Sequence, residues 1–148
     1  MKNEMTLTIK ALSINESFAR TCVAAFCVGL NPSLDEINDI KTAVSEAVTN
    51  CVVHAYPDKV GDIKIKVSIN NDLITIFITD FGIGISDVNK AREPFYTTKP
   101  EQERSGMGFT VMESFMDDVE VFNNGNSNGL TVKMCKKIAN VNYQVMGA

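Results

Sequence analysis

Two stretches of the chain alternate hydrophobic and polar residues with the period of two that is typical of a half-buried β-strand. One is residues 4–10, and the other is residues 63–69, where isoleucine or valine alternates with polar residues that include Lys64 and Lys66. Residues 73–79 are more continuously apolar and follow the second stretch across a polar turn. We therefore expect 4–10 to be an edge strand and 63–69 with 73–79 to be an antiparallel hairpin, with both lysines on an exposed sheet face.

A second hairpin is expected near the end of the chain. Residues 119–122 and 130–134 are rich in strand-forming residues, and 123–129 between them consist only of Asn, Gly and Ser. Those residue types are typical of turns. The tail from 139 to 148 shows no clear pattern.

Other stretches place hydrophobic residues at helical spacing. A first helix is expected after a cap at Ser13 or Asn15 and is predicted to end at Gly29. A second helix is expected from the capping box that Ser33 begins to about Ala55. Its apolar stripe is Ile37, Ile40, Val44, Val48, Cys51 and Ala55. A short third helix is expected to carry Phe109, Met112, Phe115 and Met116.

The order of these elements predicts an α+β fold, a two-layer α/β sandwich with a mixed, mostly antiparallel sheet and the helices on one face. The 148 residues are long enough for one domain with a sizeable core and too short for two ordinary ones, so we expect a single domain over 1–148. Residues 86–107 lack strong periodicity and are expected to form a long loop, which in a compact domain is usually functional or disordered.

Charge and targeting signals narrow the function classes. The net charge of −4 and the pI near 5.0 argue against direct nucleic-acid binding, because neutralising phosphates requires a basic face. Neither the apolar core of a signal peptide nor an 18-residue apolar stretch is present, so we expect a cytoplasmic protein with no membrane contact. The four cysteines lack close-spaced pairs, and three of them lie in apolar helical stretches, so they are interpreted as core residues.

Three polar or glycine-rich patterns are candidates for a site. Asp80 ends the apolar strand and is followed by Gly82 and Gly84, which brings backbone close to a flat ligand or simply makes a turn. Glu46 and Asn50, four residues apart on the second helix, share a face roughly opposite its apolar stripe, and that face is either functional or a solvated polar side.

The third pattern is Gly106 and Gly108 at the start of the third helix. Glycines there leave backbone N–H groups free to bind phosphate, although the pattern also fits a hinge.

Along the chain the order is Glu46 and Asn50 on a helix, then Asp80 with its two glycines, then Gly106 and Gly108 before a helix. In that order these patterns resemble the GHKL ATPase superfamily, whose ATP-binding domain is the Bergerat fold. The resemblance covers about residues 35–135. Within the superfamily, the segments 45–56 and 93–109 and the short length are similar to the anti-sigma-factor serine kinases of sporulation. The resemblance implies an ATP lid at about 86–107.

It also implies ATP and Mg²⁺ as cofactors and a role for each matched residue. Asp80 would accept a hydrogen bond from the adenine amine, Asn50 would bind Mg²⁺, and Glu46 would act as the general base. Arg104 would neutralise charge on the transferred phosphoryl group. The remaining nucleotide contacts would be Gly82, Gly84, Thr97, Thr98, Lys99, Ser105, Gly106, Gly108 and, for the adenine, Thr131.

The activity implied is that of an ATP-dependent protein-serine kinase. It would bind and inhibit a sigma factor of the sigma-F type and phosphorylate a serine on a STAS-type anti-anti-sigma protein. Arg20 matches a partner-contact position, although it also fits an ordinary exposed helix arginine, and a homodimer is expected. His54, the sole histidine, is given a structural or surface role. Two alternatives stay open: a nucleotide-gated module that sequesters the sigma factor with chemistry secondary, and a stand-alone ATPase.

Overall fold

Five strands and three α-helices account for most of the part of the chain that the computed structural model describes, residues 1–85, 92, 108–125, 128–139 and 141. The elements are β1 (Lys2–Lys10), α1 (Ile14–Cys27), the 3₁₀ turn η1 (Val28–Leu30), α2 (Leu34–Asn50), the π-helical segment η2 (Cys51–Ala55), β2 (Asp62–Asn70), β3 (Leu73–Asp80), α4 (Gly108–Phe115), β4 (Asp118–Asn123) and β5 (Leu130–Lys137). The expected order of strands and helices is confirmed.

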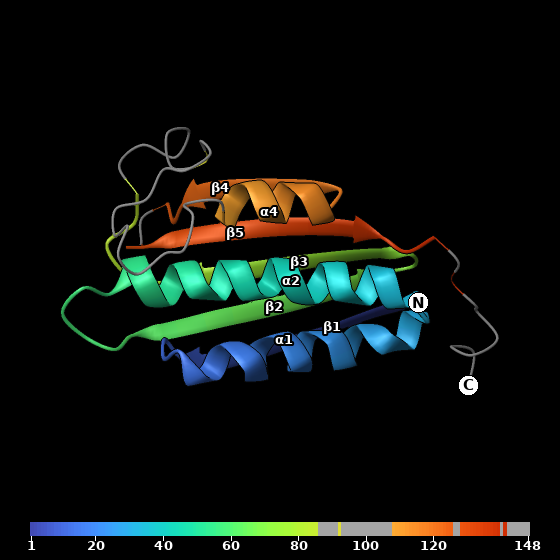
Figure 1. The fold of residues 1–148 in the computed structure, drawn as a ribbon, viewed down its shortest axis with the longest axis horizontal. Helices are drawn as coiled ribbons and strands as arrows, with labels where there is room; N and C mark the ends of the chain where they lie inside the picture. The colour runs from blue at the N-terminus through green and yellow to red at the C-terminus, as the bar shows by residue number, and fades with distance from the viewer. Residues whose placement is uncertain (86–91, 93–107, 126–127, 140, 142–148) are drawn as a thin grey trace.

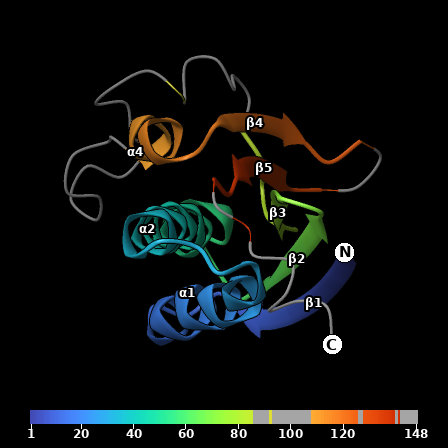
Figure 2. The ribbon, with the colours of Figure 1, turned by 90° about the vertical axis from the view of Figure 1, so that its right-hand side faces the viewer.

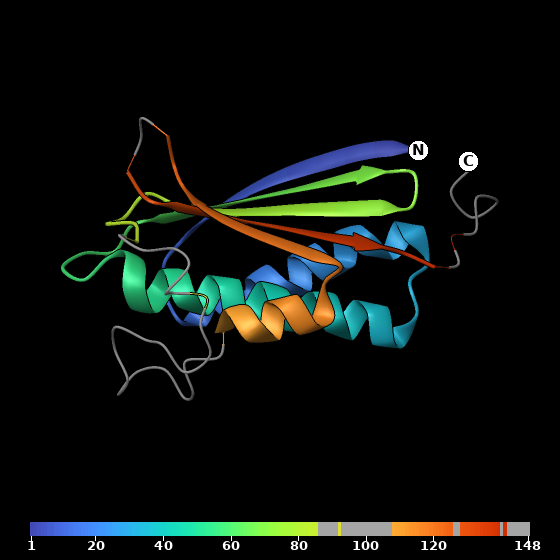
Figure 3. The ribbon, with the colours of Figure 1, turned by 90° about the horizontal axis from the view of Figure 1, so that it is seen from above.

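The strands form one twisted sheet in the order β1-β2-β3-β5-β4. All four pairings between described strands are antiparallel, whereas a mixed sheet was expected. The three helices cover one face of this sheet, as Figures 1 and 2 show from two sides, and Figure 3 shows the two layers edge-on. The α+β two-layer sandwich is therefore confirmed, with β1 at one edge as predicted.

The core lies between the sheet and the helices. Alternate residues of β2 and β3 point to the helices and are 0–2% exposed. These residues are Ile63, Ile65, Val67, Ile69, Ile74, Ile76 and Ile78. Full burial of one such side chain contributes about 1.5–3 kcal/mol. Lys64 and Lys66 occupy the other face of β2, as the alternation predicts.

The helix ends match the sequence only in part. The capping box of α2 is confirmed, because the Ser33 hydroxyl accepts from the Glu36 amide at 3.1 Å and the Ser33 amide donates to the Glu36 carboxylate at 2.9 Å. Ser13 occupies the N-cap position of α1 but makes no side-chain cap hydrogen bond. The residue in left-handed conformation after α1 is Asn31, with φ of 52°, and not Gly29.

The predicted end of the second helix at Ala55 is confirmed, but its last five residues widen into the π-helical segment η2. Such segments occur frequently at functional sites. The following residue, Tyr56, is buried, and its hydroxyl donates to the carbonyl of Asp62 at 2.6 Å and accepts from the amide of Phe81 at 2.7 Å. Tyr56 therefore fixes the end of η2 to the start of β2 and the end of β3.

All four cysteines are free thiols, and Cys27 and Cys51 are buried. Burial raises the pKa of the Cys27 thiol to about 12, as expected for a core residue. Among the described residues, no helix combines the length and the apolar character needed to cross a membrane.

Candidate functional site

Asp80, the last residue of β3, is a buried acidic residue that is 4% exposed. Its Oδ1 atom accepts from the backbone amides of Gly82 at 3.0 Å and Leu130 at 3.2 Å. Burial raises the pKa of this carboxyl, and the two amide donors and the thiol of Cys51 only partly offset that effect. Burial also raises the pKa of Cys51 and keeps its thiol protonated, so that it acts as a donor. The result is a rigidly held acceptor at the end of a strand.

The glycines after Asp80 allow segments of the protein to approach one another. A Cβ on Gly82 would lie 1.9 Å from the carbonyl oxygen of Ala55, and one on Gly84, which has φ of +72°, would lie 2.7 Å from the Asn123 Oδ1 atom. We expected both glycines to make room for a nucleotide. In the structure, the space that their side chains would take is filled by protein atoms, so their first role is to close the turn against η2 and β4.

Glu46 and Asn50 lie beside the first residue of α4. A Cβ on Gly108 would lie 3.2 Å from both amide atoms of Asn50 and 3.5 Å from the Glu46 Oε2 atom. Both polar side chains are half-buried, because α4 packs against this side of α2. The interpretation as a solvated polar side is therefore wrong. Because Gly108 has no side chain, the start of α4 can approach these two groups closely, and backbone amides at a helix N-terminus favour anions.

The carboxylate of Asp80 and the Glu46–Asn50 pair belong to one region. The end of α2, the end of β3 and the starts of α4 and β5 all lie at the same end of the molecule, on the left in Figure 1. Asn50 is followed directly by Cys51, whose thiol interacts with Asp80. The helix that carries Glu46 thus reaches the buried acceptor within two turns.

Thr131 does not join this region. It pairs with Thr79 across β3 and β5, and their hydroxyls are 3.0 Å apart on the sheet face away from the helices. Leu130, one residue earlier, faces the same side as Asp80 and is 7% exposed. The expectation that Thr131 contacts the adenine is therefore not supported, because successive strand residues point to opposite faces. The alternation of Val132 and Met134 with Thr131 carried this signal in the sequence.

Asn123, the last residue of β4, and Asn124, which follows it, hold the turn around Asp80, whereas the sequence pattern predicts only turn residues at both positions. The side chain of Asn123 bonds both backbone groups of Ile85, accepting at 3.1 Å and donating at 2.8 Å. Asn124 donates to the carbonyl oxygen of Asp80 at 2.8 Å. No pattern in the sequence distinguishes these two asparagines from the others in 123–129.

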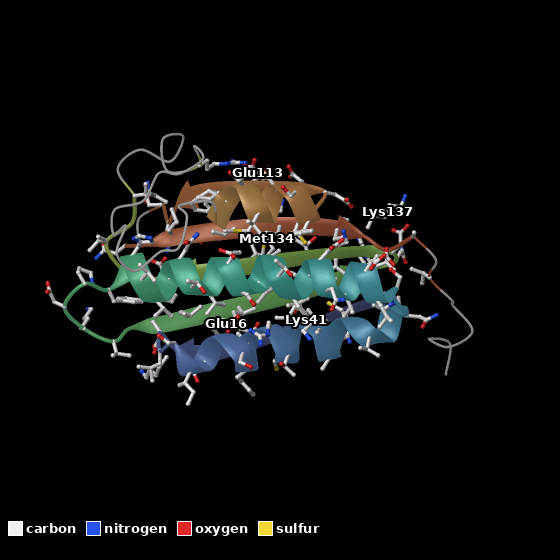
Figure 4. All side chains as sticks on the ribbon, in the orientation of Figure 1. Glu16, Lys41, Glu113, Met134 and Lys137 are labelled. Atoms are coloured by element: carbon white, nitrogen blue, oxygen red, sulfur yellow. The ribbon has the colours of Figure 1, made fainter. Side chains whose placement is uncertain are left out.

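Arg20, the predicted partner contact, is held by its own helix. Its guanidinium bonds both carboxylate oxygens of Glu16, at 2.6 and 2.8 Å. Burial raises the pKa of Glu16, but hydrogen bonds from Ser45 and Arg20 outweigh burial and lower it. Glu16 lies on the side of α1 that faces α2 (Figure 4). The Glu16 carboxylate thus links Arg20 to Ser45 of α2, the residue directly before Glu46.

Six predicted site residues lie outside the described residues, and their positions stay predictions. They are Thr97, Thr98, Lys99, Arg104, Ser105 and Gly106. Arg92, which lies in sequence between β3 and these six residues, is among the described residues. Its side chain pairs with Glu113 of α4, on the outer side of the molecule in Figure 4, and donates to the carbonyl of Val119 at 3.0 Å.

Comparisons with known proteins agree with this fold. A family profile described as a histidine kinase-like ATPase domain matches residues 11–136. Proteins named "Anti-sigma F factor" from Bacillus thuringiensis (strain Al Hakam) and Bacillus mycoides (strain KBAB4) are each 51% identical over 143 residues, which cover 96% of this chain and 97% of theirs. A solved catalytic domain of the histidine kinase ThkA superposes with a TM-score of 0.56 over 93% of this chain and 97% of that one, at 16% identity. That last likeness concerns the fold alone.

Proposed function

The chain belongs to the histidine kinase-like ATPase family, and within it to the anti-sigma F factors, and from this premise we propose that it is an ATP-dependent protein-serine kinase. In this proposal it binds and inhibits a sigma factor of the sigma-F type. It phosphorylates a serine on a STAS-type anti-anti-sigma protein, and this phosphorylation indirectly controls the sigma factor. A homodimer is part of the same proposal and rests on the family resemblance.

One observation carries the proposal: Glu46 and Asn50 both lie against the glycine that begins α4. A carboxylate, a side-chain amide and the N-terminal amides of a helix therefore lie close to one another. Such a set suits a phosphate group and a hydroxyl that attacks it, because amides bind the phosphate and a carboxylate accepts the proton.

The chemistry follows from these positions. The partner's serine oxygen attacks the γ-phosphorus of ATP, and Glu46 takes the proton of that hydroxyl. The bond from phosphorus to the bridging oxygen breaks, and ADP leaves. General-base assistance of this kind is typically worth about 10²–10⁴-fold. Arg104, outside the described residues, is proposed to neutralise charge on the phosphoryl oxygens.

Asn50 fits a magnesium ion, since it offers an amide oxygen, is half-buried and lies beside Gly108 at the start of α4. Within the described residues, no group of three His, Cys, Asp or Glu side chains could hold a metal ion. Magnesium here would take its other ligands from phosphate and water, which it prefers. When bound, it would neutralise charge on the phosphates.

Asp80 is proposed to recognise the base. Its carboxylate, when ionised, only accepts hydrogen bonds. It can therefore bind the exocyclic amine of adenine, whereas it repels the carbonyl oxygen of guanine or hypoxanthine. In this way the two ends of the site would read the base and the phosphates separately.

The test is phosphate transfer from [γ-³²P]ATP in the presence of Mg²⁺ and a STAS-type protein. We expect the label on a partner serine with the wild type and its loss with Glu46→Gln. Asp35→Asn is the matched control, because it removes an exposed carboxylate from the first turn of the same helix. ATP binding by the wild type without any transfer would overturn the kinase function and leave a nucleotide-gated sequestering module.

A further inference from the structure

The turn between β4 and β5 is bonded to the backbone of Asp80. The side-chain amide of Asn124 donates both to the carbonyl oxygen of Asp80, at 2.8 Å, and to that of Asn128, at 2.9 Å. Gly129 then passes so close, with φ of +105°, that a Cβ on it would lie 2.1 Å from the Asp80 carbonyl oxygen. One asparagine therefore connects the end of β3 to the start of β5.

The orientation of the Asn124 amide is fixed by a hydroxyl chain on the outer face of the sheet. The Thr131 hydroxyl donates to Asn124 Oδ1 at 2.5 Å, and Thr79 lies 3.0 Å from the Thr131 hydroxyl oxygen. Since Thr131 gives its one proton to Asn124, Thr79 must donate to Thr131. The NH₂ group of Asn124 is thereby directed at the two carbonyl oxygens.

Both donors that orient the Asp80 carboxylate come from the segments that Asn124 connects. The amide of Leu130 follows Gly129 directly, and the amide of Gly82 lies two residues after the bonded Asp80 carbonyl. A shift of either segment would move a donor relative to Oδ1 and turn the carboxylate.

We propose that Asn124 is a positioning residue for base recognition: it aligns the two backbone amides that aim the Asp80 carboxylate at the exocyclic amine of the nucleotide's base. This inference rests on the proposed ATP binding. It assigns part of the selectivity for a 6-amino purine to Asn124, which does not itself touch the base. Thr131 would contribute by orienting the Asn124 amide from the sheet face away from the helices.

The decisive variant is Asn124→Asp. It keeps the acceptor for Thr131 and nearly the same shape, but places a carboxylate oxygen against two carbonyl oxygens at 2.8 and 2.9 Å. We expect its affinity for ATP to fall about fivefold or more, because a turned Asp80 carboxylate makes a weaker hydrogen bond to the amine of the base. The affinity for ITP, which carries a carbonyl oxygen in place of the amine, should change less, so that the ATP/ITP ratio narrows.

The controls separate aiming from general stability. Asn128→Ala removes an exposed side chain and leaves the bonded carbonyl in place, so its ATP/ITP ratio should equal that of the wild type. Thr131→Val removes the orienting hydroxyl, keeps the size and serves if Asn124→Asp does not fold; its ratio should also narrow. Both affinities are measured by titration calorimetry, with thermal unfolding followed in parallel.

The outcomes are distinguishable. A narrowed ratio in folded Asn124→Asp or Thr131→Val supports the inference. Equal losses for ATP and ITP, or an unchanged ratio in both variants, would show a structural role only and overturn it. If the wild type binds neither nucleotide, the proposed function itself fails, and the inference with it.

Discussion

Replacing Asp80 by asparagine changes one hydrogen-bonding group at the proposed base site and almost no volume. In the wild type, Oδ1 accepts from the amides of Gly82 and Leu130. The asparagine oxygen will keep these two donors, which directs its NH₂ group to the position that a base amine would approach. Two donors then face each other at a residue that is only 4% exposed in the wild type. The variant should bind ATP poorly for this reason alone.

The expected loss follows from the burial. An unmatched hydrogen-bonding group in a buried site costs about 1–3 kcal/mol, or about 5- to 150-fold in affinity. We expect ATP binding by Asp80→Asn to weaken at least about tenfold within that range. ITP offers a carbonyl oxygen at the same position, so the affinity of the variant for ITP should rise relative to its affinity for ATP. Titration calorimetry with both nucleotides measures this directly.

The fold should survive the substitution, and its pH dependence provides a check. Burial raises the pKa of the Asp80 carboxyl above its ordinary value of 3.8, so the native state binds more protons than the unfolded state just above that pH. This carboxyl therefore lowers stability as the pH rises from 3.8 through its native pKa, and the penalty stays above it. The melting temperature of Asp80→Asn relative to the wild type should rise over the same window. Circular dichroism melts across that range test it.

One result would refute the reasoning. If Asp80→Asn has a wild-type far-ultraviolet spectrum and binds ATP with unchanged affinity, the adenine amine does not meet this carboxylate. The base would then lie elsewhere, and the role of Asn124 in aiming Asp80 would fail with it.

Three further predictions concern the phosphate end and the packing of the turn. Glu46→Gln should keep Mg-ATP binding but lose about a hundredfold in phosphorylation rate, since the amide cannot take the proton; an equal loss in affinity would place Glu46 at the metal instead. Arg104→Ala should bind ADP normally, be nearly inactive as a kinase and lose most ATP-over-ADP discrimination toward the sigma factor in surface plasmon resonance, whereas a wild-type rate would make it a solvated charge. Gly82→Ala should destabilise the fold by about 1–3 kcal/mol, because its Cβ would meet the Ala55 carbonyl at 1.9 Å, while Gly125→Ala, in open space, should not; equal melting temperatures would contradict this.

The sequence by itself determined which elements form and which face of each strand is buried. Period-two alternation in 63–69 and the capping box at Ser33 depend on neighbours in the chain, and both gave the observed strand and helix start. In 130–134 the same alternation agrees with the outward position of Thr131, whereas the family resemblance predicted that Thr131 contacts the adenine. The choice of Asp80, Glu46 and Asn50 as one site depended on the family resemblance, and the fold brings all three to one end.

Only the tertiary structure decided what each buried group touches. A pattern reports that Glu46 and Asn50 share a face, but α4, some sixty residues later, decides that the face is covered. In the same way, position 82 requires glycine because a Cβ there would meet the Ala55 carbonyl oxygen. Asn124 has its role because its side chain reaches the carbonyl oxygen of Asp80, a contact that the sequence does not show. Local rules depend on spacing along the chain, whereas these contacts depend on the strand order β1-β2-β3-β5-β4, which places residues far apart in sequence side by side.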